Sequence, residues 1–509
     1  MTAGRDAHPA AGEGDRDRPA VQAIPFAAAR RRVRDGARFC GLVAIPDQAG
    51  GGGGLGLFAI TSDDGELAFE EHRPVDGAYA TLTSDVPAAD WYERRIHDLF
   101  GIEPVGRQRP EPLVFPVPPG ARPPLAAGGD PSAALAPDPS PTPAHVHGEG
   151  VFTIPYGPVR SGVFESVEYL VETSGEDIPH LRTRIFYKHR GVDACFVGLD
   201  VDDGALLAER EEGPASVAHA LAFSQAVERM AEAAVPVAAQ LVRVVHAELE
   251  RVANHLDTMV RHTEAAGQAV AYAVLSHHKE RVQRLRARLC GSRFGRGVVV
   301  PGGVRRPPGL SPHGVLSEVG ELQRRIDQDV QRLMDTPSFV DRLRGTGVLS
   351  SDDARRFAVV GPIGRASGEE EDVRMSRPYG AYERLGHRVA RRVEGGDALA
   401  RQRVRMDELD GSFHLVRQAV DMLAELGETG GWRAAIPPVS GRAVGWTEAA
   451  QGELLSVVEA RDGRLAHVTQ RSASFHNLAA YGSAFPKDIF TDVAFIEASF
   501  GLSIAGAAG

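Results

Sequence analysis

The feature that most constrains how this chain folds is a set of four long apolar stripes with helical spacing. In the clearest of them, apolar side chains recur every three or four residues between Val242 and Met259. The other stripes run through residues 275–289, 315–333 and 404–423. Each stripe is one face of an amphipathic helix and has to be covered by another element. The simplest arrangement that buries all four faces is a helical bundle.

Short strand-like runs flank this predicted bundle in the sequence. Near the N-terminus they occupy residues 39–45, 55–61, 66–70 and 79–83. A helix is predicted over Trp91–Phe100, with Asp90 as its N-cap. One β-hairpin is predicted between residues 163 and 187, and another around the turn Asp462-Gly463. The fold class is therefore α+β: a small N-terminal α/β domain, then a mainly α-helical bundle domain with flanking β-hairpins.

Changes in composition divide the chain further. We expect a disordered leader over residues 1–20, an α/β domain over 21–103, a Pro/Ala/Gly-rich linker over 104–150 and the bundle domain over 151–509. The apolar segment Asp492–Gly509 is predicted to be a buried tail. His145 and His147 lie in the linker, where no acid or thiol stands at ligand spacing, so a solvated loop is favoured over a metal site.

Charge and cysteine content exclude several classes of protein. The formal net charge is −11, which argues against nucleic acid as a partner. The three cysteines, Cys40, Cys195 and Cys290, are far apart, so neither a CxxC metal site nor a disulfide framework is expected. No apolar run reaches the ~18 residues that a membrane span requires. The acidic run Glu369–Asp372 is predicted to be a solvated loop face.

Two neighbouring stretches concentrate residues that carry chemistry. Tyr187–Asp193 brings together a lysine, a histidine, an arginine and an aspartate directly after a strand-like run. Glu209–Ala215 is rich in acids and opens a predicted helix. Such a pair of stretches could hold a redox centre between a loop and the start of a helix.

Several motifs in one order give the chain a family resemblance. Trp91–Ile102 resembles the signature of the C subunit of respiratory complex I, a small hydrophilic protein. Gly157 to the end resembles the D subunit of complex I and the large subunits of nickel–iron hydrogenases. The matching pieces are Tyr187–Asp193, Arg243–Leu256, Pro301–Gly303, Val360–Gly368, Pro378–Tyr382, Gly396–Arg401 and Arg471–Phe475. A fusion of the two subunits is similar to energy-converting hydrogenases and their relatives, and it implies a bundle domain of hydrogenase large-subunit type.

The resemblance also shows which family residues this sequence lacks. In the active hydrogenases, two CxxC pairs supply the thiolates that hold nickel and iron; the first pair falls here on Glu212 and Ala215. No cysteine follows Cys290, so the second pair is missing as well, and no metal site is expected. The tyrosine and histidine that protonate quinone in complex I fall on Gly213 and near Ser161, so the usual quinone chemistry is not expected either.

What the resemblance retains is a charged platform. It implies that Arg190 lies over the terminal iron–sulfur cluster of a partner subunit, with Arg210 beside it, and that Asp193, Glu212 and His189 serve proton transfer. The alternatives are structural. Arg190 and Asp193 could form a plain ion pair, Glu212 could be a solvated acid at a helix N-terminus, and His189 and Arg210 could be packing residues.

These implications favour one function and leave two others open. The favoured hypothesis is a peripheral subunit on the cytoplasmic face of the membrane, within an NADH:quinone oxidoreductase-like or hydrogenase-like complex. It would dock an iron–sulfur small subunit and antiporter-like membrane subunits, bind no cofactor of its own, and couple electron transfer to proton movement, with quinone as a possible ligand. The alternatives are a quinone or other acceptor reductase that uses non-standard residues, and a structural assembly subunit.

Overall fold

The computed structural model describes residues 25–47, 54–107, 111–118, 120–126, 129, 146, 148, 150–160, 165–390, 393, 395–427 and 431–509. The predicted leader, His145, His147 and Ser161 lie outside these residues. The boundaries predicted for the four segments stay predictions.

The N-terminal part is built on an antiparallel sheet in the order β1 (Arg38–Asp47), β2 (Gly54–Asp63), β3 (Glu66–His72). Helix α1 (Ala27–Arg34) precedes it, and the short strands β4 (Ala78–Ala80) and β5 (Glu103–Val105) pair in parallel. Strands β1 to β4 confirm the sequence prediction, whereas β5 was not predicted. Helix α2 (Asp90–Phe100) closes at Gly101 with a left-handed φ of 73°. Asp90 is not the N-cap: a 3₁₀ turn, η1 (Pro87–Ala89), leads directly into the helix, so Asp90 is its first residue.

Part of the segment predicted as a linker is anchored to this helix. The buried Asp98 carboxylate accepts hydrogen bonds from the backbone N–H groups of Leu113 at 2.7 Å and Val114 at 2.9 Å. Leu113, Val114 and Phe115 are themselves buried. Residues 113–115 of this proline-rich segment therefore pack on α2.

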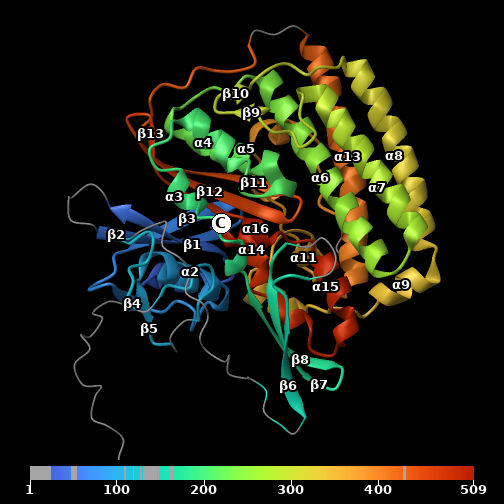
Figure 1. The fold of residues 1–509 in the computed structure, drawn as a ribbon. Helices are drawn as coiled ribbons and strands as arrows, with labels where there is room; N and C mark the ends of the chain where they lie inside the picture. The colour runs from blue at the N-terminus through green and yellow to red at the C-terminus, as the bar shows by residue number, and fades with distance from the viewer. Residues whose placement is uncertain are drawn as a thin grey trace, which may run out of the picture.

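The four predicted stripes form four long helices, on the right of Figure 1. They are α6 (Val237–Ala265), α7 (Ala269–Cys290), α8 (Pro312–Met334) and α13 (Ala398–Leu426). Helix α6 packs on α7 and α13, and α8 packs on the same two helices. The apolar side chains of the stripes meet in one buried cluster, as the periodicity requires. The Ser311 hydroxyl caps α8 by accepting a hydrogen bond from the Gly314 N–H group, which confirms the predicted start of that helix.

Two further three-stranded antiparallel sheets follow the predicted hairpins. One has the order β6 (Val151–Tyr156), β7 (Glu168–Ser174), β8 (Asp177–Arg184), and the other β11 (Gly441–Ala449), β12 (Gly452–Arg461), β13 (Arg464–Arg471). A two-stranded ribbon pairs β9 (Val299–Val300) with β10 (Gly303–Val304). Further helices are α3 (Val192–Cys195), α4 (Val201–Ala208), α5 (Ser216–Met230), α9 (Pro337–Leu343), α10 (Ser351–Arg356), α11 (Gly361–Ala366), α12 (Val373–Ser376), α14 (Ala473–Leu478), α15 (Val493–Phe500) and α16 (Ile504–Ala508).

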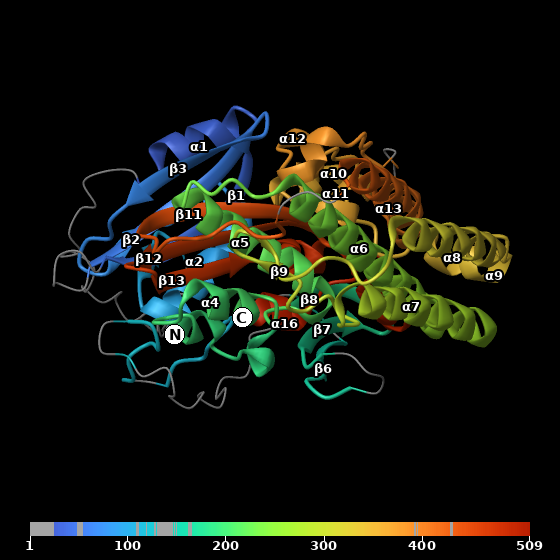
Figure 2. The ribbon, with the colours of Figure 1, turned by 90° about the horizontal axis from the view of Figure 1, so that it is seen from above.

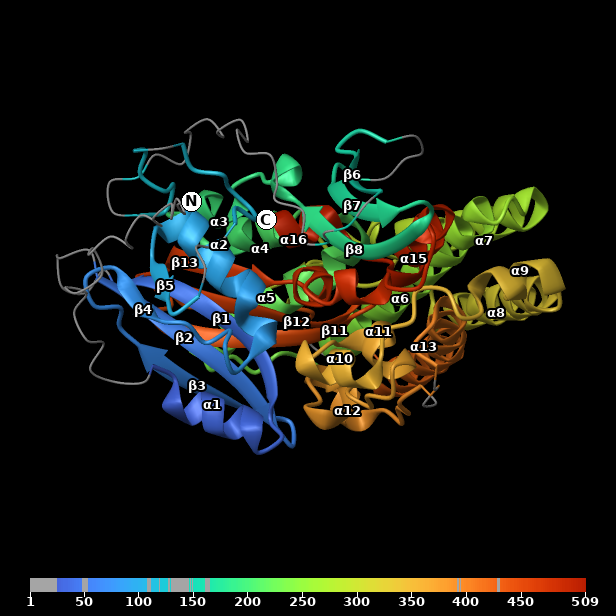
Figure 3. The same ribbon diagram turned by 90° about the horizontal axis from the view of Figure 1, so that it is seen from below.

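The sheet β11–β13 lies at the centre of the molecule. Helix α5 packs on β11 and β12. The N-terminal sheet lies beside β12 and β13 when seen from above and from below (Figures 2 and 3). Cys40, Val43 and Ile60 share a buried apolar cluster with Leu455 and Val457. The C-terminal helices α15 and α16 are buried, which confirms the prediction of a buried tail.

The buried carboxylate of Glu453 links the sheet β11–β13 to the N-terminal sheet β1–β3. Glu453 on β12 is 0% exposed and accepts hydrogen bonds from both Nη atoms of Arg38 on β1, at 2.8 and 2.9 Å. Arg377 and Arg471 donate to the same carboxylate. Nearby, the Tyr92 hydroxyl lies 2.6 Å from Nδ1 of His476. The buried Glu453 carboxylate and the Tyr92 hydroxyl at this junction are therefore both paired, as burial requires.

A second buried charge network lies between α6, α11 and α13. Arg365 contacts Glu408 at 2.6 Å and Glu448 at 3.0 Å, and its pKa is raised: burial alone would lower it, but these carboxylates outweigh burial. Asp372 is 1% exposed and contacts Arg374 at 2.6 Å. The prediction that Glu369–Asp372 is a solvated loop face is therefore wrong for Asp372.

The structure confirms that helices and strands are mixed, as the α+β prediction states. Among the residues described, no helix combines the length and the apolarity that crossing a membrane would require.

Candidate functional site

Both stretches singled out in the sequence come together near the C-terminus, at the centre of Figure 1. The first leaves β8 through a 3₁₀ turn, η2 (Phe186–Lys188), and ends in α3. The second follows α4 and enters α5 through another 3₁₀ turn, η3 (Gly213–Ala215). Helix α16 packs against η2 and α14. The predicted start of a helix after Glu212 is confirmed, because η3 leads straight into α5.

Glu212 is buried, with 2% exposure, at the position where the resemblance places a nickel thiolate. Its Oε1 atom accepts hydrogen bonds from Gln451 Nε2 at 2.9 Å and Ser474 Oγ at 3.3 Å. A Cβ atom at Gly506 of α16 would lie 2.4 Å from the Glu212 Oε2 atom, so only glycine allows this close approach. The alternative of a solvated acid at a helix N-terminus is wrong.

His219, one helical turn into α5, is fully buried beside Glu212. Its Nε2 atom lies 3.4 Å from Glu212 Oε2, and its Nδ1 atom lies 2.7 Å from Gln470 Oε1. Burial by itself lowers the pKa of His219, but the carboxylates of Glu212 and Glu211 outweigh it and the pKa is raised. The imidazole is therefore placed to share a proton with Glu212.

Glu211 is a second buried acid of the cluster, and the sequence analysis did not single it out. Burial, together with the negative charge of Asp193, raises the pKa of Glu211 to about 7. Its Oε2 atom has no hydrogen-bond partner among the described residues. A carboxyl group with such a pKa exchanges its proton near neutral pH.

Asp193 pairs with an arginine from the N-terminal part of the chain. Arg95 on α2 donates through Nη2 to Asp193 Oδ2 at 2.5 Å, and both side chains are almost completely buried. The Arg95 guanidinium also lies 5.5 Å from the centre of the Phe475 ring. The alternative of a plain ion pair between Arg190 and Asp193 is wrong, since Asp193 is paired across the contact between the two parts.

Arg190 fixes the C-terminal segment while its side chain stays exposed. Its guanidinium donates to the backbone carbonyls of Arg210 at 3.0 Å, Glu211 at 2.6 Å and Ala505 at 2.9 Å. Its own backbone N–H group donates to the Gly509 carbonyl at 2.7 Å. In these contacts the positive charge of Arg190 faces backbone carbonyl oxygens and no carboxylate.

The other two predicted residues differ in position. His189 is mostly buried; its Nδ1 atom lies 2.7 Å from the Ala508 carbonyl oxygen, and burial lowers its pKa. The Arg210 side chain is half exposed and contacts Glu209 at 2.8 Å. The structure therefore brings Asp193 and Glu212 into one cluster with Glu211 and His219, places Arg190 and His189 on its C-terminal rim, and leaves Arg210 at the surface.

The donor set does not fit a soft-metal centre. Cys40 and Cys290 are buried elsewhere and Cys195 is exposed. Within the part of the chain that the structure describes, no three His, Cys, Asp or Glu side chains are grouped so that they could hold a metal ion. Nickel–iron chemistry depends on clustered thiolates, and none surround Glu212.

A cavity of about 340 Å³ lies directly beyond this cluster. It is lined by Gly213 and Pro214 of η3, by Ser503 near α16, and by charged side chains of α6 and α7. Lys279 and Arg261 bind Asp257 there, at 2.5 and 3.0 Å. Charged side chains thus line part of the cavity, and the lining residues Gly213 and Pro214 follow Glu212 directly in the chain.

Known proteins resemble both parts of the chain. Residues 265–439 match the family described as the 49 Kd subunit of respiratory-chain NADH dehydrogenase, and residues 66–125 match the family of its 30 Kd subunit. The carbon monoxide-induced hydrogenase of Rhodospirillum rubrum is 30% identical over 309 residues, which cover 60% of this chain and 84% of the relative. The chain belongs to the family that unites the 49 Kd subunit of complex I with the hydrogenase large subunits.

Other members of this family match over similar lengths. A D subunit of the NADH-quinone oxidoreductase of Solibacter usitatus is 27% identical, covering 66% of this chain and 91% of its own. The alpha subunit of the membrane-bound hydrogenase of Pyrococcus furiosus is 29% identical, covering 68% and 84%. The predicted fusion is also shown, because the chain carries a 30 Kd subunit region ahead of its 49 Kd subunit region.

Three residues of the site, Glu211, His219 and Arg95, were not identified from the sequence, for different reasons. His219 lies on α5, outside the stretch Glu209–Ala215. Glu211 stands next to Glu212 in a run of acids, and nothing local shows which of the two is without partners. Arg95 lies 98 residues before Asp193, and only the fold brings them together. The family signature around Trp91–Ile102, which contains Arg95, was the available signal for that residue.

Proposed function

We propose that this chain is a peripheral subunit of a complex I-like, hydrogenase-related membrane oxidoreductase. Its relatives carry the names of subunits of NADH-quinone oxidoreductases and of a membrane-bound hydrogenase, which supports a role as an oxidoreductase subunit. In this proposal it docks an iron–sulfur small subunit and couples electron transfer there to proton movement in antiporter-like membrane subunits, on the cytoplasmic face. The bundle of α6, α7, α8 and α13 is then of hydrogenase large-subunit type.

The proposal depends on the acid–histidine cluster, which consists of Asp193, Glu211, Glu212 and His219. Glu211, with a pKa near 7, can take up and release a proton at physiological pH. His219 lies within reach of Glu212, and its raised pKa lets the pair share a proton. Asp193 adds the negative charge that keeps the Glu211 pKa high. These groups can hold and move protons without any metal of their own.

Arg190 supplies the link to electron transfer in this proposal. Its side chain is exposed at the rim of the cluster and is held by three backbone carbonyls, so its charge has a fixed position. A partner's iron–sulfur cluster that docks over it would have its reduced form stabilised by that charge. Through Coulomb interaction, the protonation of the acids beside Arg190 would then depend on the oxidation state of the partner's iron–sulfur cluster.

The test is to purify the native complex and measure its metals per copy of this chain. We expect iron from a partner subunit and no stoichiometric nickel. One nickel per chain would refute the proposal. Glu211→Gln in the same complex should abolish proton-coupled turnover, whereas Glu370→Gln, an exposed acid outside the cluster, should leave it unchanged.

A second candidate is an acceptor reductase that uses residues other than those of complex I. The cavity of about 340 Å³ beside Gly213 favours it, because a quinone-sized headgroup there would meet Pro214, next to Glu212. Quinone reduction by the intact complex that is lost in Glu212→Gln would support this function. An intact complex that reduces no quinone would reject it.

The remaining alternative, a structural assembly subunit, is separated by spectroscopy. In the proposed function, Arg190→Ala lowers the midpoint potential of the partner's cluster, followed by electron paramagnetic resonance. Arg190→Lys keeps the charge and should restore most of the potential. Unchanged signals in both variants would leave only the structural role.

A further inference from the structure

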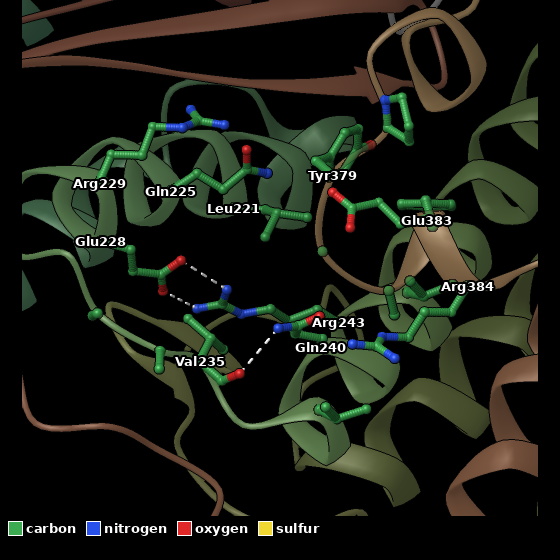
Figure 4. Close-up of a pocket in the computed structure, with 18 of the residues that line it drawn as sticks. Leu221, Gln225, Glu228, Arg229, Val235, Gln240, Arg243, Tyr379, Glu383 and Arg384 are labelled. Atoms are coloured by element: carbon green, nitrogen blue, oxygen red, sulfur yellow. Dashed lines mark hydrogen bonds and ion pairs between the residues drawn. The ribbon is translucent and has the colours of Figure 1, made fainter.

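A second cavity lies at the opposite end of α5 from Glu212. Its volume is about 650 Å³, and it is enclosed by the last turns of α5, by residues 232–237, by the start of α6 and by residues 378–384, which include η4 (Gly380–Arg384) (Figure 4). No residue of the acid–histidine cluster lines it. Its volume lies within the range of small-molecule sites in proteins.

Gln225 is the unexplained group in this cavity. Its side chain lines the cavity and is only 8% exposed. Neither its Oε1 nor its Nε2 atom has a hydrogen-bond partner among the described residues. A buried amide without partners is unfavourable, and native structures rarely keep one without a reason.

The polar neighbours of Gln225 are engaged elsewhere. Glu228 binds Arg243 through two hydrogen bonds, at 3.1 and 2.5 Å, and Gln240 donates to the Val235 carbonyl oxygen at 2.9 Å. In Figure 4 the Gln225 amide and the Glu383 carboxylate point toward one another across the cavity, from α5 and from η4. The Glu383 side chain is exposed, and among the described residues no ion pair holds it over the amide.

From this geometry we infer that the cavity binds a mononucleotide, with the edge of its base on Gln225. A carboxamide offers a donor and an acceptor side by side, and a nucleobase edge is the common small-molecule group that satisfies both at once. Leu221 and Val244 supply apolar walls, and Tyr379 and Trp446 supply aromatic ones. An aromatic-lined cavity suits a flat heterocycle.

Two of the arginines that line the cavity can bind the phosphate of such a ligand, beside the acids Glu232 and Glu383. Arg229 and Arg384 both line the cavity, and neither forms an ion pair with a carboxylate among the described residues. The Arg229 guanidinium lies 3.6 Å from the centre of the Trp446 ring, which fixes it at the edge of the site. Guanidinium groups are the preferred protein partners of phosphate.

The experiment is calorimetric titration of the purified complex with AMP, GMP, UMP and CMP, and with ribose 5-phosphate as the ligand that lacks a base. We expect at least one nucleotide to bind more tightly than ribose 5-phosphate. Gln225→Leu keeps the volume and removes both polar atoms, so it should weaken nucleotide binding by about tenfold or more, the consequence of losing two hydrogen bonds. Gln225→Glu keeps a hydrogen-bond acceptor but no donor. Its affinity for the nucleotide should lie between that of the wild type and that of Gln225→Leu.

The outcomes are separable from those of the proposed function. The Gln225→Leu complex should melt no lower than the wild type, because the change removes two unpaired buried atoms, so a loss of binding cannot be ascribed to unfolding. If no nucleotide exceeds ribose 5-phosphate, or if Gln225→Leu binds as well as the wild type, the inference is overturned. Either result leaves the nickel and turnover tests of the acid–histidine cluster unaffected.

Discussion

The buried carboxyl group of Glu211 makes the stability of the chain depend on pH in a defined direction. Its pKa is about 7 in the folded protein, against an ordinary value of 4.5. Between these two values the unfolded chain loses the proton while the folded chain keeps it, so this group makes stability fall as pH rises from 4.5 to 7. Above pH 7 the Glu211 carboxyl group is ionised in both the folded and the unfolded chain, and the loss of stability is complete.

The magnitude follows from the difference between the two pKa values. A difference of about 2.5 pKa units corresponds to about 3 kcal/mol of destabilisation above pH 7. Glu211→Gln removes the charge at every pH. We therefore compare the free energy of unfolding of the variant with that of the wild type. The difference, variant minus wild type, should be about 3 kcal/mol larger at pH 8 than at pH 4.5.

Chemical denaturation at the two pH values measures this gain. Any cost of burying the amide of the variant is the same at both pH values and cancels in the comparison. Glu370→Gln, which changes an exposed acid, is the matched control and should show no gain that depends on pH. An equal effect of Glu211→Gln at pH 4.5 and pH 8, or a larger loss at pH 8, would refute the assignment of a raised pKa.

Three further substitutions probe the contacts around the junction of the two parts. Asp193→Asn should cost about 2 kcal/mol of stability by breaking the pair with Arg95. It should also move the pH-dependent loss of stability caused by Glu211 to lower pH. Denaturation over a pH series measures both effects. Tyr92→Phe leaves the buried Nδ1 atom of His476 without its donor and should cost about 1–2 kcal/mol in the same assay; an unchanged midpoint would contradict the hydrogen bond. Glu453→Gln strips three buried arginines of their carboxylate and should cost about 3–5 kcal/mol, seen as a large drop in melting temperature, whereas a small drop would mean that the arginines find other partners.

The sequence was most informative where structure is local. The apolar stripe from Val242 to Met259 predicted α6, because helical periodicity alone decides which face is buried. Asp462-Gly463 predicted the turn between β12 and β13 for a similarly local reason, since these two residues adopt the positive φ angles that the turn requires. Capping was less certain: at Asp90 a 3₁₀ turn before the helix took the place of the expected N-cap.

Long-range charge pairing was beyond the reach of the sequence. Asp372 belongs to an acidic run that is typical of a solvated loop, yet the fold buries it with Arg374, which also binds Glu248 on the distant helix α6. The same limit applies to the site, where Glu212 was identified and Glu211 was not. Both acids are buried, and how each of them is paired depends on helices from other parts of the chain, here α16 and α2.

The position of Arg95 gives the fusion of the two regions a physical consequence. Asp193 raises the pKa of Glu211, whereas Arg95 lowers it, and the two are paired to one another at 2.5 Å. The electrostatic state of the acid cluster therefore depends on a helix from the region that resembles a separate subunit. His476 binds Tyr92 of α2, and Glu453 binds Arg38 of β1, so the N-terminal region cannot shift without disturbing buried polar contacts. The N-terminal region thus acts as part of the proton site, since Arg95 adds to the positive charge that His219 and Arg190 already place near Glu211.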